Sequence, residues 1–239
     1  MHHLQGRKII LLLAFTLLAL SQAWSQRPKG NFNYLDFQNK PYYFGITLGY
    51  NQSSFRVYNS DDFILNDSIR VLNAVNGPGL NLGIITNLKI GEYFDFRFIP
   101  SFSFAERNLQ YTSTQEDRMD EIRTIESVFL EMPFILRYKS APFNDIRIYA
   151  LTGFKYTFDV ASNSRTRQAE SLVKISPTDY ALEFGVGIQM FFPYFIFSPE
   201  IKISQGISNS LIYDDDLLQS RVIDQILSRT FTLSFHFEG

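Results

Sequence analysis

One pair of residues in this chain could act as a base and a nucleophile, namely His236 and Ser234. They are two residues apart, so in a β-strand both lie on the same face, and a histidine beside a hydroxyl is an arrangement that activates a nucleophile. No acidic residue that would orient the histidine can be identified from the sequence, and His236 lies close to the chain end. We therefore expect His236 to be structural and the protein not to be an enzyme.

Acidic residues are the second group that could do chemistry. Glu183 and Glu200 could form a carboxylate pair, but the lysines and arginines on other predicted strands favour ion pairs with them. Asp61-Asp62 and Asp214-Asp215-Asp216 lack the spaced ligands and the glycine turn of a calcium loop. The chain has no cysteine, which excludes disulfides and thiolate metal sites. The sequence therefore predicts no catalytic residue, no metal site and no cofactor.

The composition is aromatic and weakly charged. The 239 residues include 24 Phe and 13 Tyr, and 45% are hydrophobic but only 19% charged. A mean hydropathy of −0.07 excludes a bundle of membrane helices. The formal net charge is −2, and the lysines and arginines are scattered along the chain, so we expect no nucleic-acid partner. No feature predicts a small-molecule substrate.

The N-terminus predicts export. Arg7-Lys8 precede an apolar run over residues 9–20, and Ala23-Trp24-Ser25 follow as a small-residue cleavage site. We predict a signal peptide over residues 1–25 and an extended periplasmic leader over residues 26–40, which contains Pro28, Gly30 and several Asn. No later segment approaches 18 consecutive apolar residues, so residues 41–239 can cross a membrane only as strands.

Residues 41–239 alternate between large apolar and small or polar side chains with a period of two. This pattern predicts eight strands, at residues 42–50, 80–90, 94–104, 128–138, 146–156, 182–190, 195–203 and 231–237. Long connections of about 25, 20, 20 and 23 residues alternate strictly with short turns, which is typical of outer-membrane barrels. The prediction is an all-β protein: an eight-stranded antiparallel up-and-down transmembrane β-barrel with short periplasmic turns and four long external loops.

Charged residues fall opposite the apolar stripes and are expected to face the lumen, where they can pair. The predicted lumen polar network comprises Lys89, Asp95, Arg97, Glu131, Arg137, Arg147, Lys155, Glu183, Glu200 and Lys202. An eight-stranded barrel has room only for such side chains and no open channel. Tyrosines near the strand ends are expected to form interfacial girdles, namely Tyr42, Tyr50, Tyr138, Tyr156, Tyr180 and Tyr194.

The alternative fold is a soluble barrel of the lipocalin type, with the opposite polarity: apolar residues inside and charges outside. Periodicity alone does not distinguish the two. The signal peptide, the alternation of connection lengths and the aromatic last strand favour the membrane barrel, located in the outer membrane.

Several stretches resemble the PorT family, and together they span nearly the whole mature chain. They include Arg27-Pro28, residues 43–49, residues 81–84, residues 91–98, residues 126–133, residues 137–140, residues 153–156, residues 159–162 and residues 200–204. The terminal Phe237-Glu238-Gly239 departs from the final aromatic residue that outer-membrane barrels commonly carry.

The resemblance implies an outer-membrane β-barrel of Bacteroidota that is required for type IX protein secretion and, in gliding species, for surface motility. The implied partners are outer-membrane lipid and other proteins of the secretion system, and no catalytic residue or cofactor is implied. The alternative function is a stand-alone small outer-membrane barrel, of the OmpX kind, for adhesion or surface protection without a role in secretion.

Overall fold

The computed structural model describes residues 31–60, 69–113, 121–160, 174–212 and 223–239. The predicted signal peptide, residues 26–30 of the predicted leader and both acidic runs at residues 61–62 and 214–216 lie outside these ranges.

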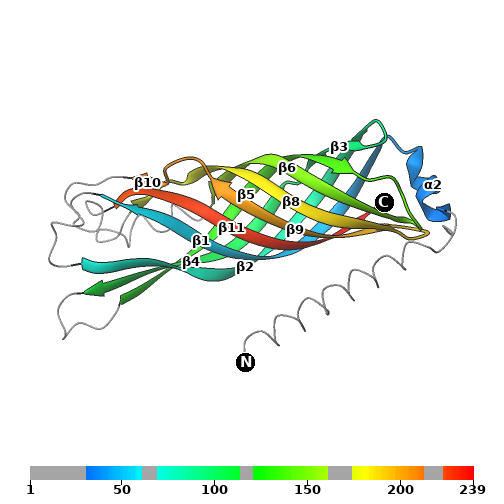
Figure 1. The fold of residues 1–239 in the computed structure, drawn as a ribbon. Coiled ribbons are helices and arrows are strands. Elements are labelled where there is room, and N and C mark those ends of the chain that lie inside the picture. Colours follow the sequence, from blue (N-terminus) through cyan, green and yellow to red (C-terminus); the bar gives the residue numbers. More distant parts are fainter. Residues whose placement is uncertain (1–30, 61–68, 114–120, 161–173, 213–222) are drawn as a thin grey trace, which may run out of the picture.

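Antiparallel strands follow one another around a barrel in chain order (Figure 1). The strands are β1 (Tyr42–Asn59), β2 (Ile69–Ile90), β3 (Phe94–Phe98), β4 (Ser101–Ser113), β5 (Glu121–Lys139), β6 (Ile146–Asp159), β8 (Thr178–Phe191), β9 (Ile196–Gly206) and β11 (Ile223–Glu238). A separate two-stranded sheet pairs β7 (Lys174–Ile175) with β10 (Leu211–Ile212).

β3 and β4 are two halves of one strand. Both pair with β2 on one side and with β5 on the other. The break lies at Ile99-Pro100, because proline has no N–H to donate to the sheet. The alternation of faces continues across the break, since Arg97, Ile99 and Ser101 are all buried. The nine strands of the main sheet therefore correspond to the eight predicted ones.

The sheet closes on itself through β1. This strand pairs with β2 on one side and with β11 on the other, in a register that runs from Gly45↔Glu238 to Asn59↔Ile223. The hydrogen-bonded ring leaves no strand edge open toward lipid, where an unpaired backbone group is costly. The predicted eight-stranded antiparallel fold, with the first strand paired to the last, is confirmed.

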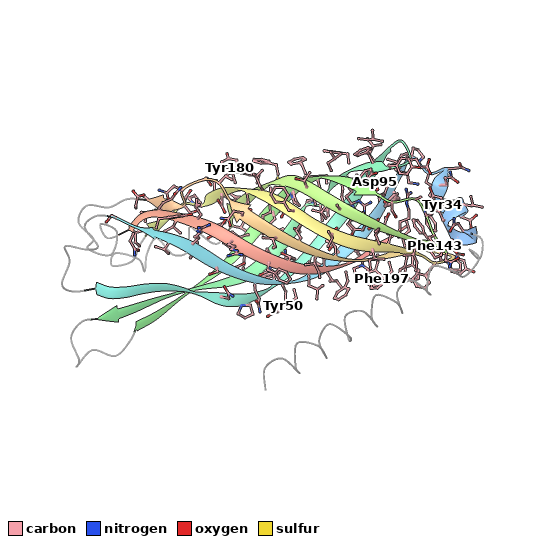
Figure 2. The ribbon with its side chains drawn as sticks, in the orientation of Figure 1. Tyr34, Tyr50, Asp95, Phe143, Tyr180 and Phe197 are labelled. Atoms are coloured by element: carbon pink, nitrogen blue, oxygen red, sulfur yellow. The ribbon has the colours of Figure 1, made fainter. Side chains whose placement is uncertain are left out.

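The two faces of the wall have opposite polarity. Large apolar side chains are exposed on the outside, and Figure 2 shows Tyr50, Tyr180 and Phe197 projecting from that surface. Charged and hydroxyl-bearing side chains are buried inside. This polarity is that of a membrane barrel and is the reverse of a lipocalin. One part of the interior is apolar, however, and was not predicted: Ile85, Ile99, Ile135, Tyr149 and Leu151 cluster within the lumen.

The first, second and fourth external connections are shorter than predicted, because the strands continue well beyond the apolar band. β1 runs to Asn59 and β2 begins at Ile69, so much of the first predicted loop is strand. In these extensions polar residues occur on both faces, because neither face contacts lipid there, and they interrupt the period-two alternation from which the strands were predicted.

The external extensions divide into two groups. β1 and β2 pair only as far as Ser53↔Gly77, and β5 and β6 only as far as Phe129↔Asp159. Beyond these points β2, β4 and β5 continue together as a three-stranded sheet, which we call the external tongue (residues 69–76, 105–113 and 121–128). It diverges from β1 and β11 in Figure 1.

The prediction of an extended leader is wrong for the segment before β1. A seven-residue helix, α2 (Phe32–Gln38), lies across the end of the barrel where the C-terminus also lies (Figure 1). The helix is short, and its apolar residues form only two pairs with helical spacing, so the sequence carries little helical signal. The pairs are Phe32 with Leu35 and Tyr34 with Phe37. Among the described residues, no helix is long and apolar enough to span a membrane.

Tertiary contacts hold α2 in place. The rings of Tyr34 and Phe37 pack on Phe191 with centroids 5.2 and 6.0 Å away. Arg147 donates from Nη1 to the Tyr34 hydroxyl at 3.2 Å. Burial raises the pKa of the Tyr34 phenol above its ordinary value of 10.0, so this hydroxyl stays neutral at physiological pH. The helix is thus a cap on the periplasmic end of the lumen, with Lys89 donating to the Phe37 carbonyl from inside.

Asp145 holds the N-terminal turn of α2 in place, and we expect Asp145→Gly to loosen this turn. The carboxylate accepts from the backbone N–H of Tyr34 at 2.9 Å and from Asn33 Nδ2 at 3.2 Å. Glycine removes both bonds without backbone strain, since the φ angle at Asp145 is +58°. Loss of these hydrogen bonds at the start of α2 should speed amide hydrogen exchange at Tyr34 about tenfold. The control is Asp36→Ala, because Asp36 is exposed on α2. Equal exchange rates at the Tyr34 amide in both variants would contradict the role given to Asp145.

Candidate functional site

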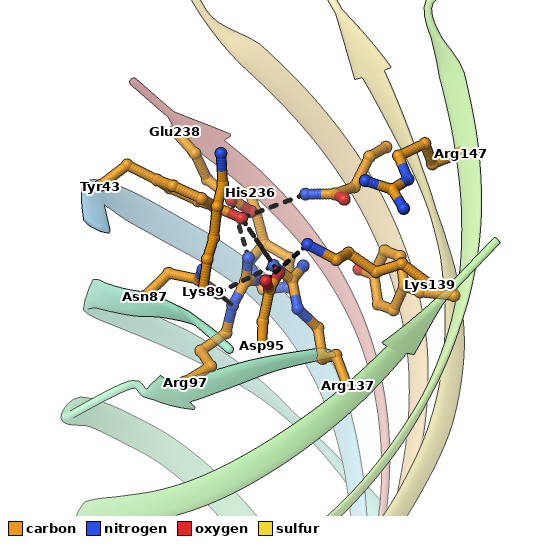
Figure 3. A network of polar contacts seen from close by, with 12 residues as sticks. Tyr43, Asn87, Lys89, Asp95, Arg97, Arg137, Lys139, Arg147, His236 and Glu238 are labelled. Atoms are coloured by element: carbon orange, nitrogen blue, oxygen red, sulfur yellow. Dashed lines mark hydrogen bonds and ion pairs between the residues drawn. The ribbon is translucent and has the colours of Figure 1, made fainter. Parts of the chain in front are cut away.

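Asp95 is the centre of a buried cluster near the periplasmic end of the lumen (Figure 3). Its carboxylate accepts from Arg137 Nη2 at 2.6 Å and from Lys139 Nζ at 2.5 Å, and the hydroxyl of Tyr43 donates to it at 3.4 Å. β3 and β5 are neighbours with Asp95 opposite Arg137, so the register of the sheet sets this pair. One carboxylate therefore neutralises part of the charge of two buried cations.

Arg97 links this cluster across the lumen to the end of the chain. Its Nη2 donates to Glu238 Oε2 at 2.7 Å, and both side chains are fully buried. Asn87 joins the two arginines, because its Oδ1 accepts from Arg97 Nε at 3.1 Å and from Arg137 Nη2 at 2.8 Å. The ion pair connects β3 to β11, which are far apart in sequence and lie on different sides of the ring.

A second cluster lies further toward the external end. Lys155 Nζ is 3.0 Å from Glu131 and 3.7 Å from Glu183. Glu183 also contacts Lys202 Nζ at 3.2 Å and accepts from Ser204 Oγ at 2.7 Å. These residues come from four strands, so their ion pairs tie β5, β6, β8 and β9 together from the inside.

His236 has an acidic neighbour that the sequence did not reveal. Its Nε2 lies 3.3 Å from Glu200 Oε2, which also accepts from the Tyr149 hydroxyl at 2.8 Å. β9 and β11 are adjacent strands, with Glu200 opposite Ser234. Glu200 is thus the acidic neighbour of His236 that could not be identified from the sequence. Ser234 itself makes no hydrogen bond to His236 among the described contacts, so the base and the nucleophile are not joined.

The structure places all ten predicted network residues on the inner face. Nine are buried, and Lys89 is half-buried at the periplasmic rim. Glu183 and Glu200 do not form a carboxylate pair, since each has its own basic neighbours.

Several residues of the network were missed in the sequence. They are Tyr43, Asn87, Lys139, Tyr149, Gln189 and Glu238. All but Tyr43 carried a signal, because each has the parity of a charged inward residue of its own strand. The matching residues are Lys89 for Asn87, Arg137 for Lys139, Arg147 for Tyr149, Glu183 for Gln189 and His236 for Glu238. Tyr43 carried none, since aromatic residues occur on both faces of that predicted strand. Within the described ranges, no group of three or more His, Asp or Glu side chains could hold a metal ion.

The arrangement binds the strands of the barrel together from the inside. Buried side chains fill the lumen at two levels, and α2 covers its periplasmic end. An eight-stranded, antiparallel, closed sheet with lipid-compatible residues outside and paired charges inside defines a small outer-membrane β-barrel protein.

Comparison with known proteins gives the same class and a family. Residues 21–211 match the family described as "Outer membrane protein beta-barrel domain", and the chain belongs to that family. The location is therefore the outer membrane. No curated protein sequence matches the chain.

Solved structures that resemble this one include an outer-membrane protein, a surface protein and an attachment protein. OprG from Pseudomonas aeruginosa is 13% identical with a TM-score of 0.47, over 83% of this chain and 95% of that one. Neisserial surface protein A is 9% identical with a TM-score of 0.42, over 82% and 95% of the two chains. Ail of Yersinia pestis, solved with a heparin analogue, is 15% identical with a TM-score of 0.35, over 83% and 99%.

Proposed function

We propose that this barrel is an accessory or assembly component of type IX protein secretion, and of gliding motility where that occurs. The resemblance of its stretches to the PorT family motivates the proposal. The barrel belongs to the outer membrane, where such a component must be located.

The observation that carries the mode of action is the filled lumen. Arg97 and Arg137 are fully buried and hydrogen-bonded across the interior, and passage of a polypeptide would require these ion pairs to separate. Breaking a buried pair costs several kcal/mol for each partner left alone. The barrel therefore acts beside the secretion conduit, as an anchor or scaffold, and not as the conduit.

The external tongue supplies a surface for such a scaffold. Its β2 and β5 segments pair with no further strand within the described part of the chain, so their outer edges present free backbone groups. Water solvates these groups outside the membrane, but they can also pair with an extended segment of another protein. We propose this edge, together with the surface of α2, as the contact sites for other secretion-system proteins.

We also propose that the protein is not an enzyme. His236 and Glu200 resemble part of a catalytic triad, but the histidine is buried and Ser234 is not bonded to it. Glu200 contacts both His236 and Tyr149, which favours a structural role in joining β6, β9 and β11.

Deletion of the gene in its own host tests the secretory role. We expect cargo that carries the type IX signal to accumulate in the periplasm, while other outer-membrane barrels insert normally. Complementation with the intact chain and with His236→Ala should both restore secretion, provided that the variant is present at equal abundance. Unchanged secretion in the deletion strain would leave a stand-alone barrel for adhesion or surface protection.

A third complementing variant tests the tongue. Replacing residues 107–125 with Asn-Gly joins Glu106 to Glu126, which are directly opposite each other, through a favoured hairpin turn. The barrel wall stays intact, and we expect secretion to remain defective. Replacing residues 161–173 with a Gly/Ser linker of equal length provides the control. Normal secretion with the shortened tongue would exclude this contact site while leaving the result of the deletion unaffected.

A further inference from the structure

Two arginines on the outer surface lie at the external edge of the apolar band. Arg229 on β11 and Arg56 on β1 are both exposed and face outward. The register places Ser54 opposite Arg229 and Leu227 opposite Arg56, so the arginines are diagonal neighbours on adjacent strands. Diagonal positions lie about 7–8 Å apart, within the common reach of two long side chains.

Their height on the barrel follows from the strand pattern. The outward positions of β11 from Phe237 to Phe231 are apolar, and Arg229 is the next outward position. A tilted strand crosses the bilayer core in about 9–11 residues, so a start at Phe237 places Arg229 at the far boundary of the core. On β1 the apolar outward run ends at Tyr50, and Gln52, Ser54 and Arg56 follow it. Both guanidinium groups therefore reach the headgroup level of the external leaflet.

Neither arginine is neutralised within the described part of the chain. No ion pair or hydrogen bond involves Arg229 there, and the contact of Arg56 is with the Tyr58 ring, 5.1 Å from the guanidinium carbon. Exposed Asp224, further out on β11, pairs with neither. This differs from the lumen, where every carboxylate of the network has a basic partner. The stacked ring orients Arg56 and leaves its N–H groups free.

We infer that Arg56 and Arg229 form a binding site for a phosphate group of the glycolipid in the external leaflet. A guanidinium binds phosphate through two parallel hydrogen bonds, and two guanidinium groups side by side can hold one phosphate monoester. Gln52, which is exposed on the same face of β1, adds an amide that can bond to a sugar hydroxyl. The site lies on the lipid-facing wall and does not depend on the proposed role in secretion.

The experiment measures binding of bisphosphorylated lipid A to the refolded mature chain in a non-ionic detergent, by native mass spectrometry. We expect the double variant Arg56→Gln/Arg229→Gln to bind about 10- to 30-fold more weakly, because each arginine near a charged lipid surface contributes roughly threefold to fivefold. Arg56→Lys/Arg229→Lys should bind with intermediate affinity, since the charges stay but the paired hydrogen bonds are lost. Lys40→Gln, at the exposed periplasmic end, is the control for loss of charge and should bind as the parent does.

Two further ligands identify the group that is recognised. Lipid A from which the phosphates have been removed should bind the parent chain as weakly as intact lipid A binds the double variant. Phosphatidylglycerol should not displace lipid A at equal concentration. Equal binding by the parent and the double variant would overturn the site, and efficient displacement by phosphatidylglycerol would overturn its assignment to the glycolipid.

Discussion

Replacing Asp95 with alanine is expected to lower the free energy of unfolding of the barrel by about 3–5 kcal/mol. The carboxylate is the shared acceptor for Arg137 and Lys139, whose side chains are 0% and 3% exposed. Removing it leaves two buried cations without an anion, and the remaining acceptors of Arg137 are the neutral Tyr43 and Asn87. The change is measured by urea titration of the refolded barrel in lipid vesicles, with the folded fraction at each urea concentration determined from heat-modifiable mobility in gels.

Two further variants separate the ionic effect from general disruption. Asp95→Ala/Lys139→Met removes one cation with the carboxylate and should recover part of the loss, because fewer buried charges are then unpaired. Asp36→Ala changes an exposed carboxylate on α2 and should alter stability by no more than about 0.5 kcal/mol. A loss at Asp95→Ala as small as that at Asp36→Ala would mean that the lumen network contributes little to stability.

A charge on the outer wall should be nearly as harmful, and Val186→Arg is expected to destabilise the inserted barrel by about 2–4 kcal/mol. Val186 is 60% exposed, and its cross-strand neighbours Ala150 and Ile201 also face outward. It lies midway along the outward apolar positions of β8, so the arginine would enter the middle of the bilayer core. The same urea titration in lipid vesicles gives the value.

The matched control places the same residue at the edge of the band. Gln52→Arg, at an exposed outward position on β1, should change stability by about 0–1 kcal/mol, because the side chain reaches the headgroups. A soluble barrel would tolerate arginine at both exposed positions. Equal, small effects of the two substitutions would therefore contradict insertion of this wall in lipid.

The sequence by itself determined the strand order, the polarity of the wall and the outer-membrane location. Alternation with a period of two is a local property, so it can be read without knowing the partner of each strand. The same parity placed Asp95, Arg97 and Arg137 on one face, and the predicted signal peptide and the connection lengths indicated that this face is the lumen. Long connections alternating with short ones also implied the up-and-down order.

Only the tertiary structure decided which inward residues meet. The ion pair of Arg97 with Glu238 joins strands on different sides of the ring, and the contact of His236 with Glu200 depends on the register of β9 and β11. Parity determines which face of a strand a residue lies on, but not its level along the barrel axis relative to residues of other strands. That level depends on the register of each strand pair and on the closure of the ring, which no local pattern encodes. The helix α2 also depends on tertiary structure. Seven residues are too few to form a stable helix alone, and contacts of Tyr34 and Phe37 with Phe191 stabilise it.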